Sequence, residues 1–161
     1  MEPETVNDHA LVWSDDLALG VEEIDEQHKR WIELVRRFQA AVAEGRSREE
    51  VYRTLAEAVI YTECHFASEQ NLMADAGYPL LHDHAGQHAL AWERLHLFTT
   101  GEVPEEDIAA YLARFLPQWL MLHINSADRK FARWLKARDG AEPAAERRAP
   151  VSGRLFADIP V

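Results

Sequence analysis

The stretch Ser47–Gly77, SREEVYRTLAEAVIYTECHFASEQNLMADAG, decides the fold class of this chain. Ser47 followed three residues later by Glu50 has the pattern of a capping box, which begins an α-helix by satisfying its free backbone N–H groups. Apolar residues then recur at intervals of three and four as far as Met73, which is the period of a helix face packed against a core. Gly77 is suited to end the helix. The stretch therefore predicts one long helix with an apolar face.

The same period appears on both sides of this stretch. Upstream, apolar residues recur over about residues 24–45, after a loop. Downstream, a third helix is expected over about residues 80–98 and a fourth over about residues 104–137, with acidic residues in the first turn of the fourth. Short connections force neighbouring helices to run antiparallel. The chain is therefore predicted to be all-α, an antiparallel up-down-up-down four-helix bundle with an N-terminal loop and a C-terminal tail.

Length and composition fit one domain. A chain of 161 residues is long enough for one hydrophobic core and too short for two of comfortable size. We expect the bundle in residues 1–138. Residues 139–161 hold three of the seven prolines and no helical period, so we expect a flexible tail there. Its end, RLFADIPV, is apolar enough to dock, which leaves a protein partner as a possibility for the tail.

The charge of the chain limits its partners. The formal net charge is −11, whereas nucleic-acid binding needs a basic footprint, and the same charge argues against an anionic membrane surface. No apolar stretch approaches the roughly 20 residues that span a bilayer. The acidic amino terminus carries no export signal pattern. We therefore expect a cytoplasmic protein with neither nucleic-acid nor membrane partners.

Cysteine and histidine usage defines the kind of metal site that is possible. Cys64 is the only cysteine, which excludes an internal disulfide and a thiolate zinc site, and we interpret it as a small core residue. Any metal site must therefore use imidazole and carboxylate ligands. His65 and Glu69 are four residues apart, as are His84 and His88, and this spacing aims two helical side chains at one point.

Antiparallel packing places the candidate ligands at one end of the bundle, because the start of each helix neighbours the end of the next. Taken singly, a histidine on an apolar face is more often a hydrogen-bonded core residue, and a single acid is more often solvated. Seven candidates from four helices at one level instead predict a two-metal site. The candidates are His28, His65, Glu69, His84, His88, His123 and Asp128, whereas His9, His82 and His96 are assigned to the surface.

The spacing of the last two candidates predicts a local irregularity. His123 and Asp128 are five residues apart, about 140° around a regular helix, so both face one centre only if they flank it or if the helix widens. A single turn of π type would bring them into line. Pro117 lies just upstream and removes the helical hydrogen bond to the carbonyl of Ala113. We predict irregular geometry between Pro117 and Asp128.

These residues resemble the hemerythrin family in its single-domain bacterial form. The resemblance spans about Trp13 to Trp134 and includes all seven ligands of the family. The matching strings are GVEEIDEQHKRW around His28, HFASEQNLM at His65 and Glu69, YPLLHDHAGQH at His84 and His88, and HINSAD at His123 and Asp128.

The resemblance implies two iron ions with a solvent-derived oxo or hydroxo bridge. The ligands of one iron would be His84, His88 and His123, those of the other His28 and His65, and the bridging carboxylates Glu69 and Asp128. One iron then has six ligands and the other five, and dioxygen would bind at the open position of the second. From ligand type alone, imidazole with bridging carboxylate suits iron, zinc or manganese.

Apolar residues beside the ligands suggest a dry pocket. In hemerythrins the positions of Phe66, Trp119, Leu120 and Ile124 wall the oxygen pocket, although periodicity alone is equally consistent with ordinary bundle core. Trp31 departs from the leucine that the family leads us to expect there. A ring in that place could narrow the pocket or the route of the gas.

Three functions are compatible with these features. The leading hypothesis is reversible dioxygen binding at a diiron centre, as a carrier, store or sensor, rather than catalysis. The second is a diiron enzyme that reduces peroxide or nitric oxide, which would need an electron donor and a proton path. The third is an oxygen-responsive signalling module whose readout is the C-terminal tail.

Overall fold

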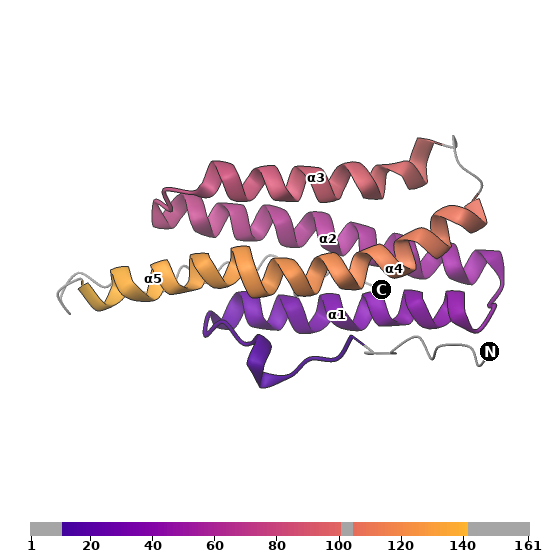
Figure 1. The fold of residues 1–161 in the computed structure, drawn as a ribbon, viewed down its shortest axis with the longest axis horizontal. Helices are drawn as coiled ribbons and strands as arrows, with labels where there is room; N and C mark the ends of the chain where they lie inside the picture. The colour runs from indigo at the N-terminus through magenta and orange to yellow at the C-terminus, as the bar shows by residue number, and fades with distance from the viewer. Residues whose placement is uncertain (1–10, 101–104, 142–161) are drawn as a thin grey trace, which may run out of the picture.

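The computed structural model describes residues 11–100 and 105–141 and confirms the all-α bundle (Figure 1). In the described ranges the regular elements are helices, in the order η1 (Asp15–Leu17), α1 (Glu22–Ala43), α2 (Arg48–Ala76), α3 (Leu81–Thr100), α4 (Glu105–His123), η2 (Ile124–Asp128) and α5 (Arg129–Ala141). Figure 1 shows α4 and α5 as one continuous rod, joined by η2, and this rod is the fourth helix of the bundle. Helices α1 and α3 each contact both α2 and α4.

Both ends of α2 follow the expected local chemistry. The Ser47 Oγ accepts a hydrogen bond from the backbone N–H of Glu50 at 3.3 Å. The Glu50 carboxylate accepts from the Ser47 hydroxyl at 3.2 Å, so it does not complete the box through the backbone. At the other end Gly77 has φ of 71°, and the N–H of Tyr78 donates to the carbonyl of Met73 at 2.9 Å. This left-handed closure reverses the chain toward α3.

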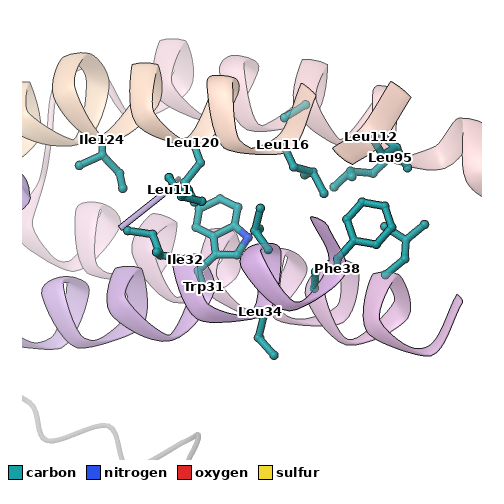
Figure 2. Close-up of a cluster of buried hydrophobic side chains, with 14 of the residues drawn as sticks. Leu11, Trp31, Ile32, Leu34, Phe38, Leu95, Leu112, Leu116, Leu120 and Ile124 are labelled. Atoms are coloured by element: carbon teal, nitrogen blue, oxygen red, sulfur yellow. The ribbon is translucent and has the colours of Figure 1, made fainter. Parts of the chain in front are cut away.

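Two apolar clusters are packed along the bundle axis. In the larger cluster, shown in part in Figure 2, Trp31 and Phe38 of α1 face leucines of α4. Each large apolar side chain buried this way stabilises the fold by about 1.5–3 kcal/mol. The smaller cluster contains Ile24 and Met73. On α1, residue 28 lies between Ile24 and Trp31, so the candidate ligands occupy a polar layer between the two clusters.

The fourth helix contains the predicted irregularity. A π-helical turn spans Ile124–Asp128, between α4 and α5. Pro117 lies inside α4, where its ring nitrogen cannot donate to the carbonyl of Ala113. That carbonyl instead accepts from the side chain of Gln39 on α1, whose Nε2 lies 3.0 Å away. The prediction of irregular geometry is confirmed, and a neighbouring helix supplies the missing donor.

The helices end slightly later than predicted. Helix α3 continues to Thr100 and α5 to Ala141, a few residues past the boundaries expected from periodicity. The rest of the predicted tail, residues 142–161, lies outside the described residues, as does His9. In the part of the chain that the structure describes, no helix combines the length and apolar character needed to cross a membrane.

Candidate metal centre

All seven predicted ligands meet in one buried layer of the bundle. Each side chain is at most 3% exposed. Helix α1 contributes one of them and α2 and α3 two each. The fourth helix contributes His123, the last residue of α4, and Asp128, the last residue of the π turn. Their donor atoms form two overlapping groups with spacings short enough to surround a metal ion. The groups are Glu69, His84, His88, His123 and Asp128, and His28, His65 and Asp128.

Three imidazole nitrogens of the first group converge on one another. The Nε2 atoms of His84 and His88 are 3.1 Å apart, those of His88 and His123 3.0 Å, and those of His123 and His84 3.2 Å. Around one ion with metal–nitrogen bonds of about 2.1 Å, neighbouring octahedral ligand atoms lie about 3.0 Å apart. Three nitrogens this close repel one another through their lone pairs unless a proton or a metal cation lies between them. The spacing therefore fits three nitrogens on one face of a metal ion.

The two carboxylates lie between the groups. One oxygen of Asp128, Oδ1, is 2.9 Å from Nε2 of His123, and the other, Oδ2, is 3.2 Å from Nε2 of His28. The Oε2 atom of Glu69 is 3.0 Å from Nε2 of His84. Its second oxygen, Oε1, is buried and accepts no hydrogen bond. Asp128 is therefore placed to contribute one oxygen to each group. The free Oε1 of Glu69 is available to the group that contains His28 and His65.

Several buried polar atoms of this layer have no hydrogen-bond partner. An unsatisfied buried polar group costs about 1–3 kcal/mol, more if it is charged. Because these atoms cluster in one place, bound cations would satisfy them together. The residues present thus fit a metal centre. They include Nε2 of His28, Nε2 of His65, Oε1 of Glu69, and both carboxylate oxygens of Asp128, whose short contacts with histidine nitrogens lack hydrogen-bond geometry. Nδ1 of His28 and Nδ1 of His123 are also unpaired, on the side of each ring away from Nε2.

The electrostatics of the layer favour a cation. Burial and the neighbouring Asp128 raise the pKa of Glu69, but its contacts with His84 and His88 outweigh them and lower it to about 2. Burial, followed by the nearby His28, lowers the pKa of His65 to about 3. The carboxylates are therefore ionised and the His65 ring is neutral at pH 7, which is the protonation state that metal binding requires.

The pKa values of Asp128 and His84 also depend on the balance between burial and contacts with oppositely charged neighbours. Burial raises the pKa of Asp128, but contacts with three histidines, led by His123, hold it well below its ordinary value. Burial lowers the pKa of His84, whereas Asp128 and Glu69 raise it, with a net result of about 9. Without metal, a proton on His84 partly compensates the two acids. A metal ion would displace that proton.

A hydrogen-bonded chain orients one of the ligands from behind. Nδ1 of His65 lies 2.9 Å from Oε1 of Gln27, which can only accept, so Nδ1 carries the proton and Nε2 presents its lone pair to the layer. Nε2 of Gln27 donates to Oγ of Ser68 at 2.9 Å, and Ser68 donates to Glu23 at 3.2 Å. These hydrogen bonds fix the orientation of the Gln27 amide, with its oxygen toward His65.

A second glutamine contacts another ligand. Nε2 of Gln70 lies 3.0 Å from Nδ1 of His88. Neither glutamine was predicted from the sequence, although each is adjacent to a predicted ligand: Gln27 precedes His28 and Gln70 follows Glu69. No spacing rule singles them out, because the partner histidine lies on a different helix in both cases.

Aromatic rings cover one side of the layer. Trp31 is fully buried with its ring 4.8 Å from that of His65. Phe66 stacks on His88 at 3.8 Å, and Trp119 stacks on His123 at 4.4 Å. The three rings also contact one another, with centroids 5.6–6.0 Å apart. Leu120 and Ile124, at most 1% exposed, extend this apolar side. All five predicted pocket residues therefore lie beside the ligands or in the adjoining cluster.

The remaining candidate residues lie away from the layer. His82 and His96 are exposed, as predicted. His96 lies beside the ring of Trp92. Cys64 is only half-buried, so its interpretation as a core residue is wrong: at its position on α2 the thiol lies at the border between core and solvent. Burial, followed by the charge of Glu63, raises its pKa.

The fold and site together define a class: a four-helix bundle whose core holds a histidine-and-carboxylate cation site. Comparison with known proteins gives the family. The sequence profile described as "Hemerythrin HHE cation binding domain" matches residues 19–135, so the chain belongs to the hemerythrin family, whose members bind dioxygen at non-haem iron.

Individual relatives agree. The chain is 37% identical over 127 residues to a bacteriohemerythrin of Stenotrophomonas maltophilia, a match that covers 79% of this chain and 82% of the relative. It is 36% identical over 118 residues to a bacteriohemerythrin of Pseudomonas aeruginosa, covering 73% and 76%. A crystal structure of a hemerythrin point mutant superposes with a TM-score of 0.62 at 27% identity, covering 78% of this chain and 98% of that one.

Proposed function

We propose that the seven converging side chains hold two iron ions and that the protein binds dioxygen reversibly there. The first ion is assigned His84, His88 and His123, the second His28 and His65, and both share Glu69, Asp128 and a solvent-derived bridging oxygen. The observation that carries this assignment is the placement of Asp128, whose two oxygens face histidines of different groups at 2.9 and 3.2 Å. A carboxylate whose two oxygens face different histidine groups is better suited to join two ions than to bind one through both oxygens.

The unequal number of histidines explains where dioxygen binds in this proposal. Three nitrogens face the first ion and two face the second, so the second ion has a position that no protein atom fills. Two ferrous ions held there would supply the two electrons that reversible dioxygen binding requires. His28 and His65 thus mark the oxygen side of the centre.

The aromatic side of the layer excludes water from the proposed dioxygen site. Trp31, Phe66 and Trp119 pack against rings of the ligand histidines, and Leu120 and Ile124 continue the apolar surface. Water and protons promote irreversible oxidation at such a centre, so their exclusion supports reversibility. Trp31 is the largest of these groups that is fully buried, and we assign it the main part in excluding water.

The two glutamines set the tautomers of their histidines. Gln27 accepts from Nδ1 of His65 and leaves Nε2 for the metal. If Nε2 of His88 is a ligand, its Nδ1 carries a proton, and this proton needs an oxygen acceptor. The amide of Gln70, 3.0 Å away, supplies one when it turns its oxygen toward the ring.

A binding role is favoured over an enzymatic one by the use of the buried acids and histidines. Among the described residues, the buried carboxyl and imidazole side chains outside the proposed ligand set reduce to Asp25, and the one buried phenol is that of Tyr78. Burial raises the pKa of the Tyr78 hydroxyl, and its ring packs against Phe131 and Trp134 in the smaller apolar cluster. Asp25 accepts hydrogen bonds from the backbone N–H groups of Leu19 and Gly20 at 2.8 and 2.9 Å, and so closes the loop before α1. A reduction reaction needs a proton donor at the pocket, and these contacts commit Asp25 elsewhere. We therefore propose a carrier, store or sensor of dioxygen.

The test is the visible absorption spectrum of anaerobically reduced protein of known iron content, before and after admission of air. We expect two irons per chain and a visible band that appears with air and fades under argon. Glu69→Ala should lose the two-iron content, whereas Glu63→Gln, which changes an exposed acid of the same helix, should keep it. Immediate conversion to a stable ferric form without the band would overturn reversible binding. Unchanged iron content in Glu69→Ala would overturn the ligand assignment.

A further inference from the structure

A small pocket connects the surface with one of the proposed ligands. It measures about 50 Å³ and lies between the turn before α3, the start of α3, and the junction of η2 with α5. Such a volume holds about two water molecules, whose share of liquid is about 30 Å³ each. Its lining residues are Tyr78, Leu80, Asp83, His84, Gln87, Ala127 and Lys130. His84 is the one proposed ligand among them, and Asp83, Gln87 and Lys130 are exposed.

The lining of this pocket suits a hydrated ion. Asp83 and Gln87 offer a carboxylate and an amide oxygen to the water shell of a cation, whereas the ammonium group of Lys130 opposes its charge. Tyr78 of this pocket belongs to the smaller apolar cluster, whereas Trp31, Phe66 and Trp119 lie in or against the larger one and present rings that suit an apolar gas. One side of the centre is therefore suited to a hydrated ion and the other to an apolar gas.

The walls of the pocket include the least regular backbone around the metal layer. On one side the chain turns between α2 and α3, and on the other Ala127 belongs to the π turn Ile124–Asp128. A π turn replaces the regular hydrogen-bond ladder of a helix, and such irregular segments open locally at lower free energy than helix interiors. Small movements here would join the pocket to the buried donors without unfolding the bundle.

We propose that this pocket is the route by which metal ions and their water reach and leave the buried centre, with His84 as the first ligand they meet. The proposal rests on the metal-binding part of the proposed function and is independent of dioxygen chemistry. Asp83 attracts the incoming cation, and Gln87 lines the passage.

The test measures metal exchange in metal-free protein with Co²⁺ as the probe. Stopped-flow absorption gives the rate of Co²⁺ loading, and transfer to excess EDTA gives the rate of release. Gln87→Phe places a ring at the pocket and should slow both rates by the same factor, on the order of tenfold, which corresponds to about 1.4 kcal/mol added to the barrier. The Co²⁺ affinity should stay unchanged, because a passage alters both directions equally. Gln118→Phe, at an exposed glutamine of α4 that does not line the pocket, is the matched control.

A second variant covers the case in which the phenylalanine disturbs folding. Asp83→Asn should slow Co²⁺ loading about threefold at low salt, with the difference vanishing at high salt because the attraction is screened. Glu93→Gln, an exposed acid of the same helix outside the pocket, should load like the parent protein.

The outcomes separate this proposal from the proposed function. Loading and release at parental rates in both pocket variants would overturn the route, and so would a loss of Co²⁺ affinity at unchanged loading rate. If exchange slows as expected but the iron-loaded protein shows no oxygen-dependent band, the route stands and reversible oxygen binding fails. If the iron-loaded protein shows an oxygen-dependent band but the pocket variants exchange Co²⁺ at parental rates, reversible oxygen binding stands and the route fails.

Discussion

Replacing Gln27 by methionine should weaken metal binding through His65 without touching a ligand. Methionine keeps the length of the side chain, which is 8% exposed, but removes the amide oxygen that accepts from Nδ1 of His65 at 2.9 Å. The ring then loses the partner that fixes its tautomer and orientation. Its Nε2 would spend part of its time protonated or turned away from the metal.

The size of the effect follows from two costs. Leaving the buried Nδ1–H of His65 without a partner costs about 1–3 kcal/mol. Loss of an acceptor behind a metal-bound histidine typically reduces affinity by about 10–100-fold, or about 1.4–2.7 kcal/mol. We therefore expect Gln27→Met to lower the affinity for Co²⁺ or Fe²⁺ within that range. The effect should fall on one of the two proposed metal ions, because His65 contributes to one group of ligands only.

The assay is a competition titration against a chromophoric chelator, with metal content and helicity measured on the same samples. Gln27→Glu is the matched variant, since it keeps an acceptor oxygen and adds a charge that favours the Nδ1 proton. It should bind metal at least as tightly as the parent. Equal weakening in both variants, or parental affinity in Gln27→Met, would refute the reasoning that the acceptor oxygen acts through the His65 tautomer.

Three further predictions concern other parts of the structure. Gln39→Met should lower the free energy of unfolding by about 1–2 kcal/mol, because it leaves the Ala113 carbonyl unpaired. In a Pro117→Ala background, where the backbone N–H of residue 117 again donates to that carbonyl, the same change should cost nearly nothing. Equal losses of stability in both backgrounds, measured by chemical denaturation, would contradict this. Trp31→Leu should cost about 2 kcal/mol in the same assay and speed the oxidation of the reduced protein in air, and an unchanged oxidation rate would show that the ring does not exclude water. Burial raises the pKa of Cys64, so the thiolate fraction, and with it the alkylation rate with iodoacetamide, should still climb about tenfold per pH unit up to about pH 9; a plateau below pH 8 would argue against a raised pKa.

Much of the site could be predicted because its elements are local. The pairs His65 with Glu69 and His84 with His88 need only one regular helix each to present two ligands on one face. The five-residue interval to Asp128 likewise predicts a widened turn, and the structure contains one. In each case the relevant geometry lies within a single helix, where backbone hydrogen bonding sets the angle between side chains.

The contacts that were missed all join different helices. Gln27 reaches His65 from α1 to α2, and Gln39 reaches the Ala113 carbonyl from α1 to α4. Such partners depend on the rotation and axial shift of packed helices. The error over Cys64 has the same origin, since a residue at the edge of the apolar stripe is buried or exposed according to how closely the next helix approaches.

Local sequence patterns thus predict the helices, the caps of α2, the candidate ligand set and the level at which the ligands meet, because short-range periodicity and connection length encode these features. Helix packing in three dimensions sets how Asp128 divides its two oxygens between the groups, which residues hydrogen-bond to the ligands, and where a polar pocket approaches His84. These features depend on how whole helix faces interlock. The way in which helix faces interlock depends on side-chain packing throughout the core, which the spacing of residues within one helix does not specify.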